Sequence, residues 1–234
     1  MHIEITSQIS NQTIAVLVTT DYRTAGVFRK YGLDFCCGGK KTVADACRSH
    51  NLDTDEVLDE LGRVMTSVNG TVPRFNAWSP ELLIHYITDN HHTYVREALT
   101  RIPFFINKVA DRHAETHPEN VEIAALFSEL SREMTDHMAS EENEVFPLIT
   151  AWLKQKDEAS RARLEQLVEN MESEHSGAGA LMARIRELSN QFTPPPGACN
   201  TYQVAYAELE AFERDLHQHV HLENNILFPK ALNA

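Results

Sequence analysis

Two stretches of the chain share the pattern H-x3-E-x4-F-P, and this repeat restricts the fold more than any other feature. One copy begins at His137 and contains Glu141, and the other begins at His219 and contains Glu223. A four-residue step on an α-helix turns about 400° and rises about 6 Å, so each histidine and its glutamate point the same way, one turn apart. Each copy therefore offers a metal one nitrogen and one oxygen ligand from a single helix face.

The region that contains the repeat, residues 79–234, has the apolar spacing of long helices nearly throughout. A capping residue followed by proline opens it at Ser79. Loop-like sequences at residues 117–120, 154–160 and 193–200 divide it into four helices. No alternating strand pattern of comparable length occurs in the sequence. We therefore predict an all-α fold whose C-terminal part is a four-helix bundle.

Each of the four predicted helices has an apolar seam that contains one histidine. The seam positions are Ile84, Ile87, His91, Tyr94 and Ala98 on the first helix; Phe127, Leu130, Met134, His137, Glu141 and Leu148 on the second; Leu164, Val168, Met171, His175, Ala178, Met182 and Ile185 on the third; and Leu209, Phe212, Leu216, His219, Glu223 and Ile226 on the fourth. Seams of this kind face the interior of a bundle. The midpoint of each successive histidine pair falls in or beside a predicted turn, so antiparallel helices bring all four to one level.

Six side chains are therefore predicted to bind metal in one layer of the core: His91, His137, Glu141, His175, His219 and Glu223. Burying them without metal would be costly, because each needs a partner. Two bridging carboxylates and four imidazoles suit a pair of iron or manganese ions, whereas zinc more often takes a smaller tetrahedral set. A ferritin-like arrangement is disfavoured, because only Glu172 and His175 have its E-x-x-H spacing and Glu172 lies off the seam. The repeat favours a haemerythrin-like arrangement, with open positions that could bind dioxygen, nitric oxide or peroxide.

For other polar residues of the bundle, spacing leaves more than one role open. His113 lies about 33 Å from His91 along a helix, which places it at a turn and outside the metal layer. Glu133 and Glu174 are predicted to orient a ligand histidine or to relay protons, with a solvated helix face as the alternative. Three histidines lie off their seams and are predicted to contact the ligands from outside or to face solvent: His92, His217 and His221.

The N-terminal part reads as a separate unit. Residues 1–66 are predicted to form a small helical domain, and residues 67–78 form a linker to the bundle at residues 79–234. The four cysteines of the chain are not spaced as a disulfide framework, so a reducing, cytoplasmic location is expected.

Cys36 and Cys37 lie side by side in this domain, followed by two glycines and two lysines. A helix start near Thr42 and the nearby lysines are expected to lower the pKa of these thiols. We predict that the pair passes electrons, nitrosyl groups or iron. The alternative is that both are packed thiols without a chemical role.

Composition narrows the possible partners. The formal net charge of -13 argues against nucleic acid and anionic membrane surfaces. No apolar run approaches the roughly 20 residues that span a bilayer, and the first residues lack the pattern of a signal peptide.

Taken together, the motifs resemble those of the RIC (repair of iron centres) family of di-iron proteins. "FRKYGLDFCCGGKKTVADA" is similar to the short cysteine domain of that family, and "HMASEENEVFP", "MESEH", "TPPPGAC" and "HLENNILFPKAL" are similar to its haemerythrin-like domain. The resemblance implies a cytoplasmic homodimer that is induced by nitrosative or oxidative stress and restores damaged iron–sulfur clusters. It also implies two iron ions per chain on the six ligands named above, with an oxo bridge between the ions as a further expectation. The family's histidine at the end of the first bundle helix corresponds to His113.

Three functions fit such a site. The first is donation of iron to damaged iron–sulfur proteins, the second is reduction of nitric oxide at the di-iron centre, and the third is reversible gas binding or sensing without catalysis. All three need an open di-iron site. A separate cysteine domain favours the first two.

Overall fold

A computed structural model describes residues 9–67 and 73–234. It contains two compact units, Met1–Leu83 together with Val220–Asn233, and Ile84–His219 together with Ala234. Across the described residues the regular elements are helices, and the β-bridge there is an isolated pairing of Thr13 with Thr42. The predicted all-α fold is confirmed.

The first unit packs short helices around a small apolar core. Its helices before the bundle are α2 (Ile14–Thr20), α3 (Thr24–Lys30), α4 (Val43–Ser49), α5 (Thr54–Thr66) and the 3-10 turn η1 (Phe75–Ala77). As predicted, Thr42 caps α4, and its hydroxyl oxygen accepts a hydrogen bond from the Asp45 backbone N–H at 3.1 Å. Leu17, Phe28 and Leu61 are fully buried where α3 packs on α2 and α5. Residues 1–8, and residues 68–72 of the predicted linker, lie outside the described chain.

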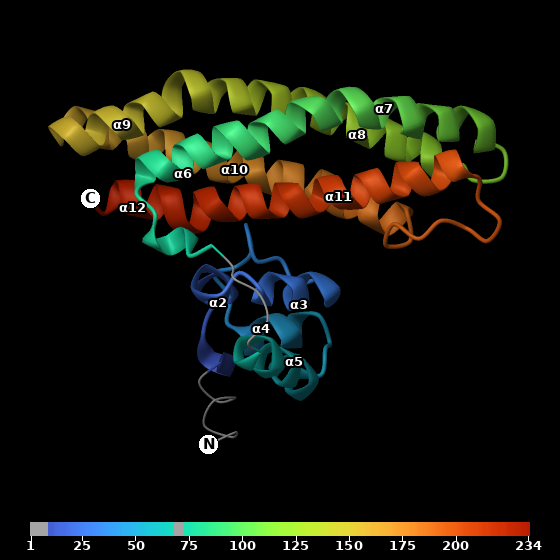
Figure 1. Cartoon of the computed structure of the whole chain (residues 1–234), viewed down its shortest axis with the longest axis horizontal. Helices are drawn as coiled ribbons and strands as arrows, with labels where there is room; N and C mark the ends of the chain where they lie inside the picture. Colours follow the sequence, from blue (N-terminus) through green and yellow to red (C-terminus); the bar gives the residue numbers. More distant parts are fainter. Residues whose placement is uncertain (1–8, 68–72) are drawn as a thin grey trace. The chain divides into compact units, whose positions relative to one another are not determined.

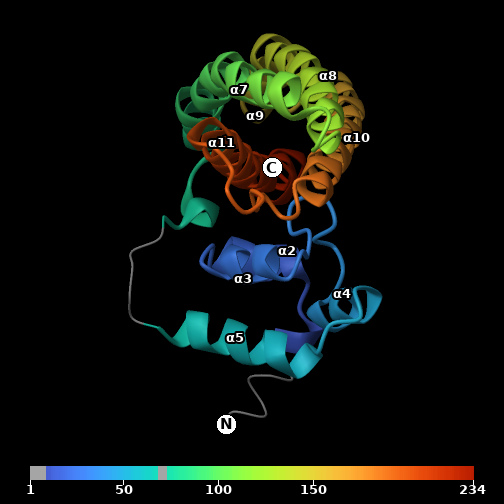
Figure 2. The same ribbon diagram turned by 90° about the vertical axis from the view of Figure 1, so that its right-hand side faces the viewer.

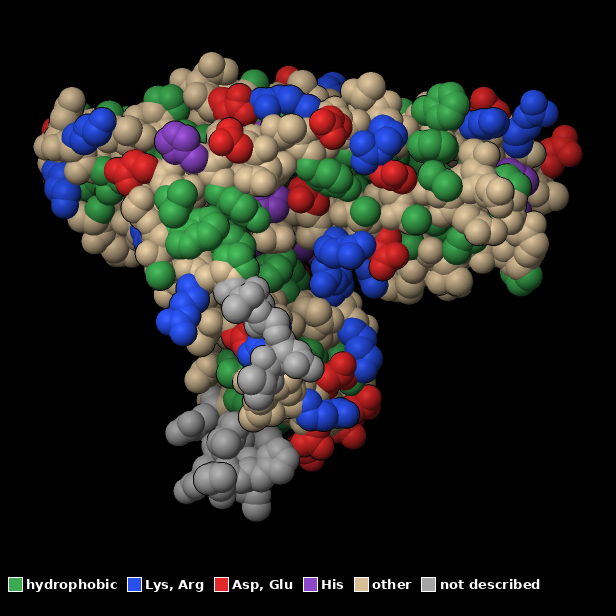
Figure 3. Space-filling model, viewed as in Figure 1, with side chains coloured by type: hydrophobic (Ala, Val, Ile, Leu, Met, Phe, Trp, Pro, Cys, Tyr) green, Lys and Arg blue, Asp and Glu red, His purple; other side chains and the backbone are tan. Residues whose placement is uncertain are grey.

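The second unit contains long helices that lie side by side. They are α6 (Pro80–Tyr86), which begins in the first unit, α7 (Thr93–His113), α8 (Glu119–Ser140), α9 (Phe146–Gln155), α10 (Glu158–Leu188) and α11 (Asn200–Leu222). Figure 1 shows them lengthwise, and Figure 2 shows α7, α8, α10 and α11 end-on around a common axis. The breaks between them fall at the three predicted loops. Acidic and basic side chains are interspersed over the face of the bundle in Figure 3.

Three of the long helical stretches contain a π-helical segment. These segments are η2 (Ile87–His92), η3 (Glu141–Val145) and η4 (Glu223–Leu227), and the last is followed by α12 (Phe228–Leu232). In η3 and η4 the wide turn directly precedes Pro147 and Pro229, which cannot donate to the carbonyl four residues earlier and clash with it in a regular helix. A wider turn relieves that clash. Each such turn holds one extra residue and therefore moves the buried face by one position.

The buried seams follow this change of frame. On α10, which has no π segment, all seven predicted positions are buried or nearly so. After η2 the fully buried residue is Val95, while the predicted Tyr94 is half-buried. After η3 the fully buried residue is Ile149, while the predicted Leu148 is half-buried.

Within residues 9–67 and 73–234, no helix combines the length and apolarity needed to cross a membrane.

Candidate metal centre

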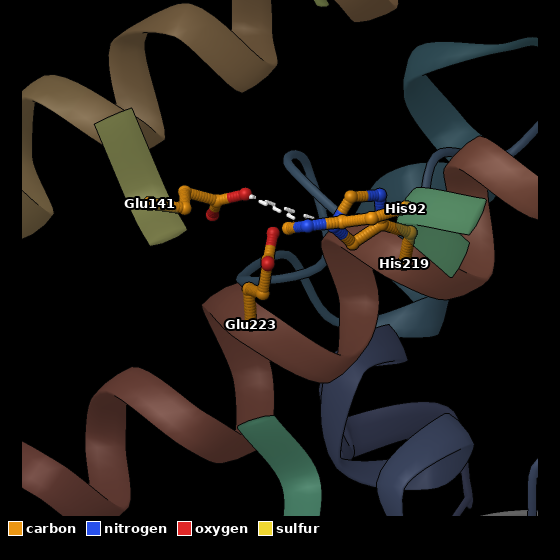
Figure 4. Close-up of side chains that lie close together, drawn as sticks. All are labelled: His92, Glu141, His219 and Glu223. Atoms are coloured by element: carbon orange, nitrogen blue, oxygen red, sulfur yellow. Dashed lines mark ion pairs between the residues drawn. The ribbon is translucent and has the colours of Figure 1, made fainter. Parts of the chain in front are cut away.

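Two overlapping groups of histidine and glutamate lie in the core. One consists of His92, Glu141, His219 and Glu223, and the other of His137, Glu141, His175 and Glu223. In each group the potential ligand atoms lie within 4.8 Å of one another, and every member is buried. Figure 4 shows the first group with its side chains converging. Both groups share the same two carboxylates.

The helices position these side chains as the repeat predicts. Glu141 follows His137 by one turn and is the first residue of η3, and Glu223 follows His219 by one turn and is the first residue of η4. Each glutamate therefore stands where the helix widens. The π turn that precedes each Phe-Pro pair therefore also sets the orientation of the glutamate carboxylate.

Glu141 lies at the centre of this arrangement. Its side chain is fully buried, and within the described chain neither carboxylate oxygen accepts a hydrogen bond. Its Oε2 atom instead faces three imidazole Nε2 atoms: that of His92 at 3.2 Å, that of His137 at 3.4 Å and that of His219 at 3.9 Å. A buried carboxylate of this kind requires a positive charge close by.

The other ring nitrogens of two of these histidines are held by carboxylates. The Nδ1 atom of His92 hydrogen-bonds Oε1 of Glu142 at 2.6 Å, and that of His137 hydrogen-bonds Oε2 of Glu174 at 2.8 Å. A neutral histidine that donates through Nδ1 has its lone pair on Nε2. Two lone pairs would then point at the Glu141 carboxylate, which is unfavourable unless a cation lies between them. The residues therefore fit a metal ion, with carboxylates behind the ligand histidines.

The two supporting carboxylates have lowered pKa values. Burial raises the pKa of Glu142, but hydrogen bonds from His92 and Arg96 outweigh it and leave a net decrease. The hydrogen bond from His137 lowers the pKa of Glu174 against the effect of burial. Both are therefore anionic at neutral pH and add electron density to the histidines. Glu174 was predicted for this role from the sequence, whereas Glu142 was not.

His91 occupies a different place from the one predicted. Its Nδ1 atom hydrogen-bonds Asp215 at 2.9 Å, its ring stacks on that of His219, and it belongs to neither four-residue group. His92, predicted to lie outside the layer, is completely buried and takes the position beside Glu141. Counting at 3.6 residues per turn favours His91, and the extra residue of η2 moves the inward position to His92. The other five predicted ligands are brought together, and the ligand set itself stays a prediction.

Two other histidines, His113 and His221, and the predicted Glu133 lie around this layer or away from it. His113 ends α7 and contacts the ring of Tyr202, with 5.4 Å between centroids. His221 is completely buried, and burial lowers its pKa to about 4. Glu133 lines a cavity of about 540 Å³ beside α8 and α10, together with Glu174, His137 and several small residues. This cavity connects two of the grouped histidines with exposed carboxylates.

The cysteine pair differs from the prediction in its acidity. Cys36 is buried and Cys37 is half-buried, and both are free thiols. The pKa of Cys36 is raised well above its usual value by the hydrogen bond with Cys37, by burial and by the negative charge of Asp34. The predicted decrease in pKa is therefore wrong for Cys36. The sequence argument counted the lysines and the helix start, and overlooked the nearer carboxylate of Asp34.

Comparison with known proteins agrees with the fold and the centre. Residues 83–231 match the hemerythrin HHE cation binding domain, and residues 10–65 match ScdA_N, a domain of unknown function (DUF542). The chain is 32% identical over 225 residues to the iron–sulfur cluster repair protein ScdA of Staphylococcus haemolyticus, covering 95% of this chain and 99% of that protein. It is 35% identical over 227 residues to the iron–sulfur cluster repair protein YtfE of Yersinia pestis, covering 96% and 98%. The predicted resemblance is confirmed, and the chain belongs to the family of iron–sulfur cluster repair proteins that join a ScdA_N domain to a hemerythrin HHE domain.

Proposed function

We propose that this protein holds two iron ions in its bundle and donates iron to iron–sulfur clusters damaged by nitrosative or oxidative stress. The observation that carries the proposal is the pair of overlapping groups that share Glu141 and Glu223. Two four-ligand groups with two carboxylates in common suit two ions bridged by both carboxylates. Each ion would then have two histidines of its own, His92 and His219 on one side and His137 and His175 on the other.

The donor atoms favour iron and also favour its release. Imidazole and carboxylate suit iron or manganese, and the groups contain no thiolate that would hold a soft ion tightly. Four protein ligands per ion leave positions open, and bound iron would supply redox activity and exchangeable coordination there. The cavity beside His137 and His175 offers an exit lined by Glu133 and Glu174, whose carboxylates attract a divalent cation.

The proposed clients are proteins that contain damaged iron–sulfur clusters, because the relatives in Staphylococcus and Yersinia are named for such repair. We further propose nitric oxide or dioxygen as small ligands of the centre. The homodimer, the cytoplasmic location and the oxo bridge stay predictions from the family resemblance.

The decisive experiment starts from protein purified without oxygen. We expect about two irons per chain and a Mössbauer doublet pair typical of carboxylate-bridged iron. This protein should reactivate a dehydratase whose [4Fe–4S] cluster was damaged with nitric oxide, and lose iron as it does so. The matched control is the Glu141→Leu, Glu223→Leu double variant, which keeps the helices but should bind little iron and restore no activity.

Two results would overturn the proposal. One is a dehydratase that free ferrous iron reactivates and the iron-loaded protein does not. The other is sustained production of nitrous oxide, over many turnovers with an electron donor, without loss of iron, which would identify a nitric oxide reductase instead.

A further inference from the structure

A second cluster of metal-binding side chains lies in the loop between α3 and α4. Asp34, Cys36 and Cys37 each offer one ligand atom, and these atoms lie within 4.8 Å of one another. The two sulfur atoms are 3.8 Å apart, and Sγ of Cys36 is 3.1 Å from Oδ1 of Asp34. The bundle groups share no residue with this cluster.

The separation of the sulfurs suits a shared ion. In a tetrahedral site with metal–sulfur bonds of about 2.3 Å, two thiolates stand about 3.8 Å apart. A thiolate and a carboxylate oxygen in the same site stand about 3.5 Å apart. The distances in the loop are close to both values. An ion could therefore bind with small side-chain movements and no rearrangement of the backbone.

The loop holds this geometry in place before any ion binds. The Asp34 carboxylate accepts hydrogen bonds from the backbone N–H groups of Cys36 and Cys37 at 2.8 and 3.0 Å, and from that of Gly38 at 2.8 Å. Gly39 is required, because a Cβ atom there would lie 2.6 Å from the carbonyl oxygen of Phe35. The side chains of the cluster are thus fixed by the backbone that carries them.

A helix of the same unit supports the loop from the other side. The amide nitrogen of Asn225 donates to the carbonyl oxygen of Cys36 at 3.1 Å and to that of Phe35 at 3.4 Å. The ring of His221 packs edge-on against the ring of Phe35, with 5.8 Å between centroids. Because both residues belong to Val220–Asn233, these contacts lie within the first unit.

The three side chains of the cluster differ in their exposure to solvent. Cys36 is buried, Cys37 is half-buried and Asp34 is exposed. An ion held by these three would keep its fourth position toward solvent. Such an ion could exchange with a ligand from outside, unlike a structural zinc ion that is closed by four protein ligands.

We propose that Asp34, Cys36 and Cys37 form a second metal site that binds one divalent, thiophilic cation. Binding forms two metal–sulfur bonds and one metal–oxygen bond, and the two thiol protons pass to solvent. In the cell the bound ion would be ferrous iron. Only this choice of ion rests on the proposed function, whereas the site itself does not. The site would then take iron in transit, whereas the bundle stores it.

Cobalt(II) added without oxygen to the iron-loaded full chain tests the site. Thiolate ligation gives a sulfur-to-cobalt charge-transfer band in the near ultraviolet, and the bundle groups contain no sulfur to produce one. We expect one equivalent of cobalt to produce the band. Cys37→Ser removes one of the two thiolates and should weaken cobalt binding and lower the band to about half its intensity or less. Asp34→Asn should weaken cobalt binding at least about 10-fold, and Cys199→Ser, at an exposed free cysteine, should leave the band unchanged.

Bundle iron content and helicity, measured on every variant, show that the chain has folded. Cys37 is the safer target because it is only half-buried. Asp34→Asn keeps an oxygen that accepts from the Cys36 and Cys37 N–H groups and loses the second oxygen, which accepts from the Gly38 N–H. A folded protein that gives no band, a band of undiminished intensity in Cys37→Ser, or equal cobalt affinity in Asp34→Asn would each overturn the site. Failure of cluster repair with the band intact would instead count against the proposed function.

Discussion

The Nε2 atom of His92 lies 3.2 Å from Oε2 of Glu141, and both side chains are completely buried. The adjacent His91 directs its Nδ1 atom to Asp215. Variants at these two adjacent histidines can therefore be compared directly, one as the test and the other as its control. We predict that His92→Gln lowers iron content to about one ion per chain or less, while His91→Gln retains iron, because its amide still donates to Asp215. Metal analysis of both variants decides this, and equal loss from the two would contradict the assignment.

Replacing Glu141 separates metal binding from stability. In metal-free protein this buried carboxylate faces lone pairs rather than donors, so Glu141→Leu should raise the unfolding free energy of the metal-free form by about 1–4 kcal/mol. The same variant should gain no stability when ferrous iron is added, whereas the wild type should gain. Urea unfolding with and without iron measures both effects. A Glu141→Leu protein that is less stable than wild type without metal would show that the carboxylate is satisfied in some other way.

Glu174 supports His137 from a half-exposed position, so its loss should loosen the metal without unfolding the bundle. We expect Glu174→Gln to weaken iron binding about 10- to 100-fold and to speed iron loss to a chelator. Glu169→Gln, at an exposed position of the same helix, is the control and should match wild type. Identical release rates in the two variants would argue that Glu174 belongs merely to the solvated surface.

The four cysteines should differ in their reactivity toward alkylating reagents at neutral pH. Cys199 is exposed and should be modified first, and Cys37 is half-buried and should follow. Cys36 and Cys47 are buried and their pKa values are raised, for Cys36 chiefly by the hydrogen bond with Cys37 and for Cys47 chiefly by burial, so both should stay protected until the protein unfolds. Peptide mass spectrometry over time gives the order, and rapid modification of Cys36 would contradict it.

Two glycines offer opposite effects on stability. A Cβ atom at Gly39 would lie 2.6 Å from the carbonyl oxygen of Phe35 and 2.9 Å from Cβ of Ala15, so Gly39→Ala should destabilise the protein by about 1–3 kcal/mol. On α10, a Cβ atom at Gly179 meets no atom within 4 Å, so Gly179→Ala should stabilise it by about 0.5–1 kcal/mol. Thermal unfolding should show the opposite shifts. A stable Gly39→Ala variant would mean that the loop relaxes easily.

The sequence predicts helices and their limits well because caps, prolines and apolar spacing are local signals. The whole seam of α10, including His175, follows from one count along an uninterrupted helix. The same count fails at His92 and Ile149, because each follows the start of a π turn that spacing does not reveal. The prolines at positions 147 and 229 are the available signal for two of these turns, and no such residue marks η2.

Other features of the sites depend on contacts between distant segments. Asp215 and His91 are separated by more than a hundred residues, as no periodic pattern could show. Asp34 is two residues from Cys36, yet its effect on the thiol depends on the turn that brings its carboxylate back to Sγ. Such pairings require the fold, so the sequence could name the candidate residues and could not give their partners.

The π turn at Glu141 divides one continuous helix into two parts with different alignment frames. Residues up to the glutamate follow one frame, and residues from the phenylalanine onward follow another that is rotated by about 100°. Deleting one residue from 142–145 would remove the extra residue, join the two frames into one regular helix and bring Ile149 to the position where a regular count from His137 places the seam. Sequence alignments and grafted designs of this bundle therefore have to treat the two halves of the helix as separate modules.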